Sequence, residues 1–346
     1  MKIYLTLDYE LFLLEPAEDI NQSLLQPTLR FHNLLKKYNS RAVYFVDAGY
    51  LFALDRQKDQ FGKIQADYEK IIQQIQFLSE EGNEIGLHIH PHWEDCYFDG
   101  KAWKMDLRRY KLADFTRAEA AGIFKKYYHV LQSVSPAKII SFRAGGWCLE
   151  PFGYIRDAMI ECGISIDSSV YFGGYSRNDT HSYDFRTYPA KDSWRFSIDP
   201  SVEDVNGNFL EMPFATYQLQ PSLFWKVLLS RVLNISKNKE IGQGVQPTVR
   251  EVLNKLFLKT THAVSMDSIK SEVLLPSFKQ NLRSEKNNYC IIGHPKCFTE
   301  LTYINLEQFI QYALKTGNTI STFSELDKQE NSPIYKGVSR NLSSVA

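Results

Sequence analysis

Strand-like and helix-like hydrophobic patterns alternate along most of the chain. Short runs of apolar and β-branched residues predict strands, and apolar residues three and four positions apart predict helices. The predicted strands are residues 2–7, 41–47, 84–90, 138–142, 164–170, 289–293 and 319–323. The predicted helices are residues 22–38, 68–81, 116–131, 152–161 and 306–315. Repeated strand–helix units of this kind predict a parallel sheet, either open or closed into a barrel.

Two stretches interrupt this alternation. Residues 172–215 are rich in Gly, Ser, Asn, Asp and Pro, with short strand-like pieces between them. Residues 220–286 have helical, polar patterns between apolar patches, and we interpret them as a largely helical insertion before the last strand. Beyond Leu326 the sequence is polar with little periodicity, which predicts a loose tail over residues 327–346. We therefore expect one domain over residues 1–326 that carries the insertion.

Charge, cysteine content and hydropathy restrict the class of protein. Lys plus Arg and Asp plus Glu each number 40 among 346 residues, so the net charge is zero and no nucleic-acid partner is expected. The five cysteines are odd in number and none has a CxxC spacing, which is typical of reduced thiols. The chain does not open on a basic region followed by an apolar stretch, and it has no run of about 18 apolar residues. We expect a cytoplasmic protein, and the sequence leaves its oligomeric state open.

Residues 84–93, Glu-Ile-Gly-Leu-His-Ile-His-Pro-His-Trp, carry the strongest chemical signal. Three of the eight histidines in the chain, His88, His90 and His92, fall within five residues at the end of a predicted strand. Neutral imidazole is the commonest biological metal ligand, so the cluster predicts a metal site. The alternative is a cluster of structural histidines.

Strand geometry decides which of these histidines can share a metal. Residues two apart on an extended strand point the same way and lie about 6.6 Å apart, so His88 can pair with His90 if the strand continues. Residues four apart would lie about 13 Å apart, so His88 can pair with His92 only if the chain turns between them. Pro91 makes such a turn plausible, because proline cannot extend a central ladder.

Carboxylates end the first predicted strand, in Leu5-Thr-Leu-Asp-Tyr-Glu10. Asp8 and Glu10 alternate on one face at its carboxyl end, where active sites of parallel α/β barrels lie. One such carboxylate can ligate a metal while the other accepts a proton from the bound water. A solvated loop start is the alternative interpretation.

Two further segments place charged or titratable groups at strand ends. Residues 141–147, Ser-Phe-Arg-Ala-Gly-Gly-Trp, put Arg143 in a position to hold a fixed charge beside two glycines that permit close backbone approach. Residues 291–296, Ile-Ile-Gly-His-Pro-Lys, put His294 at another strand end. The alternatives are a surface turn and a structural histidine.

In this order the four segments resemble the polysaccharide deacetylase family, also called carbohydrate esterase family 4 or the NodB-homology family. The family pattern is a carboxylate pair, His-x-x-x-His, an Arg and a late His. The resemblance runs from residue 1 to about 323 and is weakest across 172–286. It implies an α/β fold, a distorted (β/α) barrel of about seven strands, and one divalent metal ion, usually zinc. It also implies removal of an acetyl group from an N-acetylated sugar or polysaccharide intermediate. Because we expect no signal peptide and reduced cysteines, we expect this substrate to be an intracellular intermediate of surface-polysaccharide biosynthesis.

The resemblance assigns metal ligands by position. His88 and His92 match the two metal-binding histidines of the family, which leaves His90 between them. Asp8 matches the catalytic base, and Glu10 stands where a metal-binding Asp often falls. Because the family's adjacent Asp-Asp is Asp-Tyr-Glu here, the third ligand is either Asp8 or Glu10.

The resemblance also assigns the remaining catalytic groups. Arg143 matches the arginine that orients the base, although Arg-Ala-Gly replaces the usual Arg-x-Pro. His294 matches the general acid that protonates the leaving amine. The family's late Asp-Trp motif has no clean match, and Asp167 is our candidate for the carboxylate that tunes this acid. Trp93 and Trp147, next to the histidine and arginine motifs, are candidate substrate-binding residues, because aromatic faces suit sugar rings.

Two other functions fit parts of the sequence. A metal hydrolase resembling an amidohydrolase would use His88 and His90 as a His-x-His pair, but it would want further ligands, and His181 and His262 lie in insertion-like contexts. A non-catalytic sugar-binding member of the fold would lack the base, ligand and acid candidates that are present here.

Residues 222–234, within the insertion, form an amphipathic segment. Lys226, Ser230 and Asn234 share one helical stripe and apolar residues cover much of the rest, with Trp225 near the border. A helix of this length is about 20 Å long, too short to span a bilayer. It predicts either a peripheral membrane contact or a helix packed on the barrel or at a dimer interface.

Overall fold

The computed structural model describes residues 1–11, 19–232, 256–284 and 286–330, and a curved central sheet of nine strands organises them. The strands are β1 (Lys2–Tyr9), β2 (Val43–Asp47), β3 (Glu84–Ile89), β6 (Ser141–Ala144), β7 (Ile166–Asp167), β10 (Trp194–Phe196), β11 (Phe209–Glu211), β14 (Asn288–Gly293) and β15 (Thr319–Ile320). Their order is β10-β11-β7-β6-β3-β2-β1-β14, with β15 also beside β1. Every pairing is parallel except β10 with β11.

The sheet curls until its far segments meet. Phe214, just after β11, forms single parallel bridges to Tyr171 on one side and to Cys290 of β14 on the other. The predicted distorted (β/α) barrel is thereby confirmed, and β10 and β11 are the strands beyond the seven predicted. All five residues of β2 are buried, as expected for a parallel strand covered on both faces, and this explains its continuous apolar sequence.

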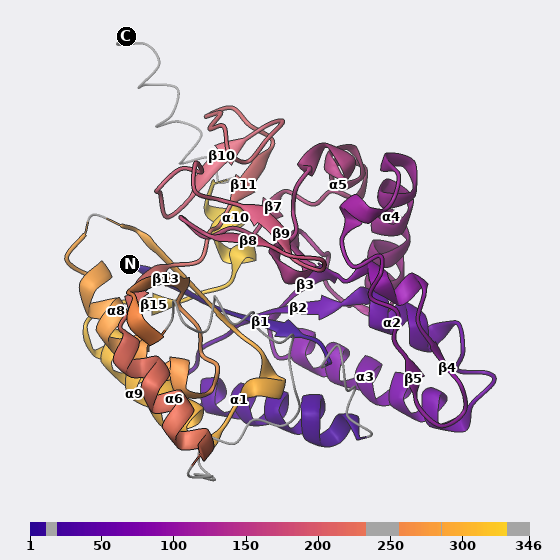
Figure 1. Ribbon diagram of the computed structural model, residues 1–346, viewed down its shortest axis with the longest axis horizontal. Coiled ribbons are helices and arrows are strands. Elements are labelled where there is room, and N and C mark those ends of the chain that lie inside the picture. The colour runs from indigo at the N-terminus through magenta and orange to yellow at the C-terminus, as the bar shows by residue number, and fades with distance from the viewer. Residues whose placement is uncertain (12–18, 233–255, 285, 331–346) are drawn as a thin grey trace.

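Helices cover the outside of the sheet. They are α1 (Gln26–Lys37), α2 (Ala48–Asp55), α3 (Gly62–Glu80), α4 (Arg117–Val134), α5 (Arg156–Cys162), α9 (Glu300–Lys315) and α10 (Phe323–Glu330), and a π-helical turn, η1 (Asn21–Leu25), leads into α1. In Figure 1 helices α9, α1, α3, α2 and α4 follow one another around the strands. No described helix is long and apolar enough to cross a membrane.

Helix α2 is absent from the sequence-based prediction. Its sequence, Ala-Gly-Tyr-Leu-Phe-Ala-Leu-Asp, is apolar on nearly every side, so it has no helical period to detect. The signal lies at its start: the Asp47 carboxylate accepts hydrogen bonds from the N–H groups of Gly49 and Tyr50, as a helix N-cap does.

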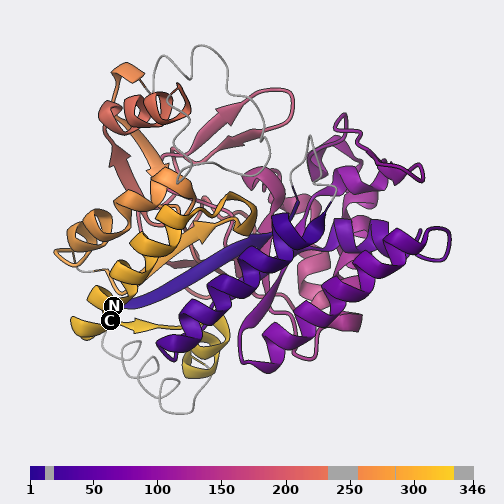
Figure 2. The ribbon, with the colours of Figure 1, turned by 90° about the horizontal axis from the view of Figure 1, so that it is seen from below.

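The insertion lies between the barrel strands β11 and β14. Strand β12 (Thr216–Leu219) leads into it and pairs antiparallel with its strand β13 (Thr260–Ala263). The insertion also contains α6 (Pro221–Val232), a 3-10 segment η7 (Ser268–Val273) and α8 (Leu274–Asn281). Figure 2 shows its red and orange segments on one side of the barrel and the purple helices α3 and α4 on the other. Residues 233–234 of the amphipathic segment and 331–346 of the predicted tail lie outside the described residues, whereas 327–330 belong to α10.

Shorter elements connect the barrel strands. They are the hairpins β4 (Tyr97–Phe98) with β5 (Trp103–Lys104) and β8 (Tyr175–Arg177) with β9 (Ser182–Asp184), and the 3-10 turns η2 (Pro91–Glu94), η3 (Leu112–Asp114), η4 (Gly145–Trp147), η5 (Phe152–Tyr154) and η8 (Pro295–Cys297). Turns η2, η4 and η8 each follow a barrel strand at its carboxyl end, so their residues border the edge where the chemical motifs meet.

Candidate metal and catalytic site

The parallel register brings the chemical motifs to one edge of the sheet. His88 of β3 pairs with Asp47 of β2 on one side and with Arg143 of β6 on the other. Glu10 directly follows β1, and His294 directly follows the neighbouring strand β14. Carboxyl ends of parallel strands meet at one edge, which is why motifs distant in sequence converge there.

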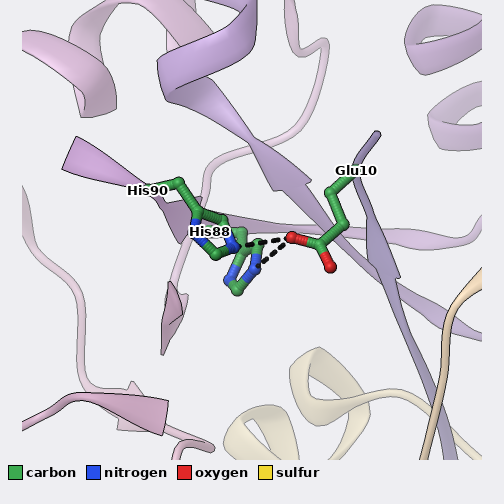
Figure 3. A group of neighbouring side chains, drawn as sticks. All are labelled: Glu10, His88 and His90. Carbon is green, nitrogen blue, oxygen red and sulfur yellow. Dashed lines mark hydrogen bonds and ion pairs between the residues drawn. The ribbon is translucent and has the colours of Figure 1, made fainter. Parts of the chain in front are cut away.

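Glu10, His88 and His90 form one candidate metal group. Each offers a ligand atom, and these atoms lie within 4.8 Å of one another. Glu10 Oε2 lies 3.3 Å from His88 Nε2 and 2.6 Å from His90 Nε2. Figure 3 shows both imidazole rings directed at this one carboxylate oxygen. A second group, Asp8, Glu10 and His294, shares Glu10 and meets the same distance limit.

The donor set of the first group fits a catalytic divalent metal. His88 Nδ1 lies 2.9 Å from the main-chain carbonyl of Arg143, which can only accept, so Nδ1 carries a proton and Nε2 faces Glu10. This arrangement fixes the ring as outer-shell hydrogen bonds fix metal-ligating histidines. His90 is buried, its Nε2 pairs with Glu10 Oε2, and its Nδ1 makes no hydrogen bond within the described part of the chain. Two imidazoles and a glutamate are a known ligand set of catalytic zinc.

His92 does not join this group. His90 retains extended dihedral angles (φ −109°, ψ 97°), so the strand alternation continues from His88 to His90 and directs both rings to one side. The chain turns only afterwards, at η2, which takes His92 to a buried position where it stacks on Tyr110 with ring centroids 5.7 Å apart. Burial, together with the neighbouring His90, holds the pKa of His92 well below its usual value. The structure therefore places His90, rather than the expected His92, beside His88 and Glu10.

Two glycines follow Arg143 and Ala144: Gly145 makes room for the ring of His90, and Gly146 makes room for Tyr110 and His181. A Cβ atom at Gly145 would lie 2.7 Å from Nδ1 of His90, and one at Gly146 would lie 2.8 Å from both His181 and the Tyr110 hydroxyl. Gly146 also has a positive φ of 58°, which side chains rarely adopt. The glycine at position 145 therefore leaves the space that the ring of His90 occupies beside Glu10.

Arg143 holds Asp8 in the buried part of the site. Its guanidinium donates to Asp8 Oδ1, to the Ser168 carbonyl at 2.8 Å and to Thr6 Oγ1 at 2.8 Å, and it lies over the ring of Phe45. Burial alone would raise the pKa of Asp8, but Arg143, His88 and His294 together hold it well below its usual value. Asp8 therefore stays ionised with one oxygen fixed, as the resemblance to a catalytic base requires.

His294 faces two carboxylates. Its Nδ1 lies 2.8 Å from Asp267 Oδ2, and its Nε2 lies 3.4 Å from Asp8 Oδ2. Burial favours neutral imidazole, but Asp267 and Asp8 outweigh it and raise the pKa of His294 to about 10. The ring is 21% exposed, more than Asp8, Glu10, His88 or His90, so it reaches furthest toward solvent.

The carboxylate partner of His294 is Asp267, and the expectation for Asp167 is wrong in this respect. Asp167 lies in β7 and accepts from the hydroxyl of Ser169 at 2.8 Å, which ties that loop to the strand. It is paired in register with the buried Glu211 of β11. Burial and the nearby Asp167 raise the pKa of Glu211 well above its usual value, which favours the neutral form of this carboxyl group. Asp267 lies in the insertion, where the sequence offered no motif for it.

The two candidate substrate-binding tryptophans differ in position. Trp93 is 1% exposed, donates from Nε1 to Asp47 at 2.7 Å and packs on Tyr50. It is therefore a buried packing residue next to the site and has no surface for a sugar. Trp147 is partly exposed, just beyond β6, and its ring packs edge-on against Tyr171. Of the two, only Trp147 has surface to offer a ligand.

Sequence reasoning did not identify Lys296 as part of the site. This buried residue of η8 donates to Glu10 Oε1 at 2.9 Å and to the Leu11 carbonyl at 2.7 Å. Its position could have indicated this role, because Lys296 follows His294 by two residues at the same strand end.

Comparisons with known proteins identify the fold. No protein-family model and no curated protein sequence matches the chain. A protein from Mycobacterium smegmatis assigned as a polysaccharide deacetylase superposes with a TM-score of 0.52 at 13% identity, covering 95% of this chain and 89% of its own. The allantoinase PuuE superposes with a TM-score of 0.50 at 11% identity, covering 96% of this chain and 91% of its own. The chain has the fold of these two proteins, whose assigned activities differ.

Proposed function

We propose that this protein is a metal-dependent hydrolase that removes the acetyl group from an N-acetylated sugar. One observation carries the proposal: a group of metal-ligand type, a buried Asp–Arg pair and a hydrogen-bonded His–Asp pair meet at the carboxyl edge of a barrel. The fold shared with the Mycobacterium smegmatis protein supports the assignment, because that protein is assigned as a polysaccharide deacetylase.

Glu10, His88 and His90 would hold one divalent metal ion, and zinc suits their ligand types. A zinc ion held there would supply Lewis-acid chemistry, because it would make a coordinated water more acidic and would polarise a carbonyl oxygen. The protein supplies the direction of the ligands, through the contact of His88 with the Arg143 carbonyl and the extended backbone at His90.

Asp8 is positioned as the general base. Arg143 fixes Oδ1, which leaves Oδ2 to accept a proton from the attacking water. Asp8 Oδ2 lies 3.9 Å from His88 Nε2, so this oxygen borders the group that would hold the metal.

His294 is positioned as the general acid. In the metal-free chain Asp267 and Asp8 raise its pKa to about 10, which favours the protonated ring that can give its proton to the leaving amine. Asp267 then stabilises the orientation of the ring throughout, because it accepts from Nδ1 while Nε2 faces the reacting groups.

Acetate release tests the proposed function. Purified protein reloaded with zinc should release acetate from a panel of nucleotide-linked, lipid-linked and polymeric N-acetylated sugars, and a chelator should abolish the release. Stoichiometric metal without release from any member of the panel would refute the deacetylase assignment and leave the metal site standing.

Hydrolysis of a different C–N bond is the second candidate function. The convergence of His88 with His90 matches the His-x-His arrangement of the amidohydrolase alternative, and an allantoinase shares the fold. Ammonia or ring-opened product from cyclic amides, without acetate release from sugars, would favour this candidate.

A further inference from the structure

Lys296 contacts one oxygen of the Glu10 carboxylate, and the two histidines face the other. The Lys296 ammonium donates to Oε1 at 2.9 Å, whereas Oε2 faces the rings of His88 and His90. Figure 3 shows that the contacts of the two rings end on one carboxylate oxygen, with the other directed elsewhere. The carboxylate is thus held between the Lys296 side chain and the candidate metal group.

Neighbouring strand ends supply the two partners. Glu10 follows β1 and Lys296 lies in η8, which follows β14, and these strands pair from Lys2 to Leu7. The same ammonium donates to the Leu11 carbonyl at 2.7 Å, so it fixes the main chain just beyond Glu10 as well as its side chain. Glutamate has one more rotatable bond than aspartate, and this double contact restricts that freedom.

Lys296 is buried yet charged. It is 8% exposed. The Glu10 carboxylate compensates this buried charge, because its Oε1 lies 2.9 Å from the ammonium. A buried ammonium beside Oε1 repels a second cation from that oxygen, because the interaction of like charges is poorly screened away from water.

We propose that Lys296 is a positioning residue that restricts Glu10 to coordinating a metal through Oε2 alone. This inference rests on the proposed metal site. With one oxygen from Glu10 and one nitrogen each from His88 and His90, coordination positions stay open for water and for a substrate oxygen, as hydrolysis requires. Without the ammonium, Oε1 becomes available, and the carboxylate can coordinate through both oxygens.

Visible absorption of the cobalt(II)-loaded full chain tests this role, because these bands report coordination number. In Lys296→Met and in Lys296→Gln, which keeps a polar side chain of similar length, the bands should weaken and shift to shorter wavelength as a second oxygen joins. Lys111→Met is the matched control: Lys111 is also mostly buried, with 13% of its side chain exposed, but it pairs with Asp114 at 2.9 Å. Its spectrum should equal that of the wild type.

The outcomes separate the inference from the proposed function. A wild-type chain that binds no cobalt refutes the proposed metal site. A wild-type chain that binds cobalt, with folded Lys296 variants of unchanged spectrum, refutes the positioning role alone. If thermal melts show that neither Lys296 variant folds, Lys296 is a structural residue and the inference is overturned.

Discussion

His90 and His92 lie two residues apart, but their rings have different surroundings. His90 meets Glu10 at 2.6 Å, whereas His92 stacks on Tyr110 inside the protein. We expect His90→Ala to weaken zinc binding at least about 100-fold, because even outer-shell partners contribute 10–100-fold. His92→Ala should keep near wild-type zinc affinity and lose about 1–3 kcal/mol of unfolding free energy through lost packing.

Titration with a competing chelator, together with denaturant unfolding, measures both effects. The family pattern His-x-x-x-His predicts the opposite result, because it makes His92 the metal ligand and not His90. Loss of zinc in His92→Ala with retention in His90→Ala would therefore show that the metal-loaded chain rearranges around His92.

Asp8 and His294 should each contribute to the rate rather than to metal retention. Asp8→Asn and His294→Ala are expected to lower kcat by about 10²–10⁴-fold each, the usual contribution of a general base or acid. An asparagine at position 8 still accepts from Arg143, so the fold should survive the first change. Metal analysis and acetate release on the same samples check this, and near wild-type kcat in either variant would remove that residue from the mechanism.

At the residue scale, the sequence predicts which residues belong to the site better than it predicts their contacts there. Asp8, Glu10, His88, Arg143 and His294 do meet at one edge of the sheet. The choice between His90 and His92 depended on where the strand ended, and Pro91 ends it one position after His90. No local pattern could pair His294 with an aspartate 27 residues earlier, because that contact exists only in the folded chain.

At the scale of elements, periodicity predicted those with one buried face and failed where burial was complete. Helix α3 was detected from its alternation of apolar and polar residues, although it begins at Gly62 rather than 68. Helix α2 was missed because nearly all of its residues are apolar and buried. Strands β1 and β14 were predicted from their continuous apolar runs, which are typical of strands in a parallel sheet covered on both faces.

Helix α6 presents an apolar surface that suits a lipid interface. Trp225 and Leu229 are 42% and 54% exposed, and Phe257, whose ring lies 6.1 Å from that of Trp225, is 65% exposed. We expect co-sedimentation with anionic liposomes that is lost when Trp225 and Phe257 are both changed to Ser. Ile304→Ser, which removes an exposed apolar residue from α9, is the control and should leave sedimentation unchanged.

The folding of the double variant and the sedimentation of the wild type decide between a membrane contact and a protein contact. If it unfolds, or if the wild type stays in the supernatant, this surface belongs to a protein interface or to the core, as the other interpretation of residues 222–234 holds.

At the scale of the whole molecule, the proton on His294 links stability to pH. In the metal-free chain its pKa is raised from 6.5 to about 10, so its favourable contacts contribute fully below pH 6.5 and are lost as the pH rises toward 10. The stability difference between wild type and Asp267→Asn should therefore be largest below pH 6.5 and shrink toward pH 10. Urea unfolding in chelator across this range measures it, and a difference that grows with pH would contradict the assignment.

Asp267 belongs to the inserted segment and not to the barrel that carries the other catalytic groups. The barrel alone therefore does not set the proton affinity of His294. Thermodynamic linkage makes the dependence reciprocal: whatever holds Asp267 against His294 favours the protonated imidazole, and protonation in turn anchors the insertion. A ligand that displaces η7, which begins at the residue after Asp267, would thus change the acidity of a group it never touches. In this architecture, variation in the insertion can retune acid catalysis while every barrel residue stays the same.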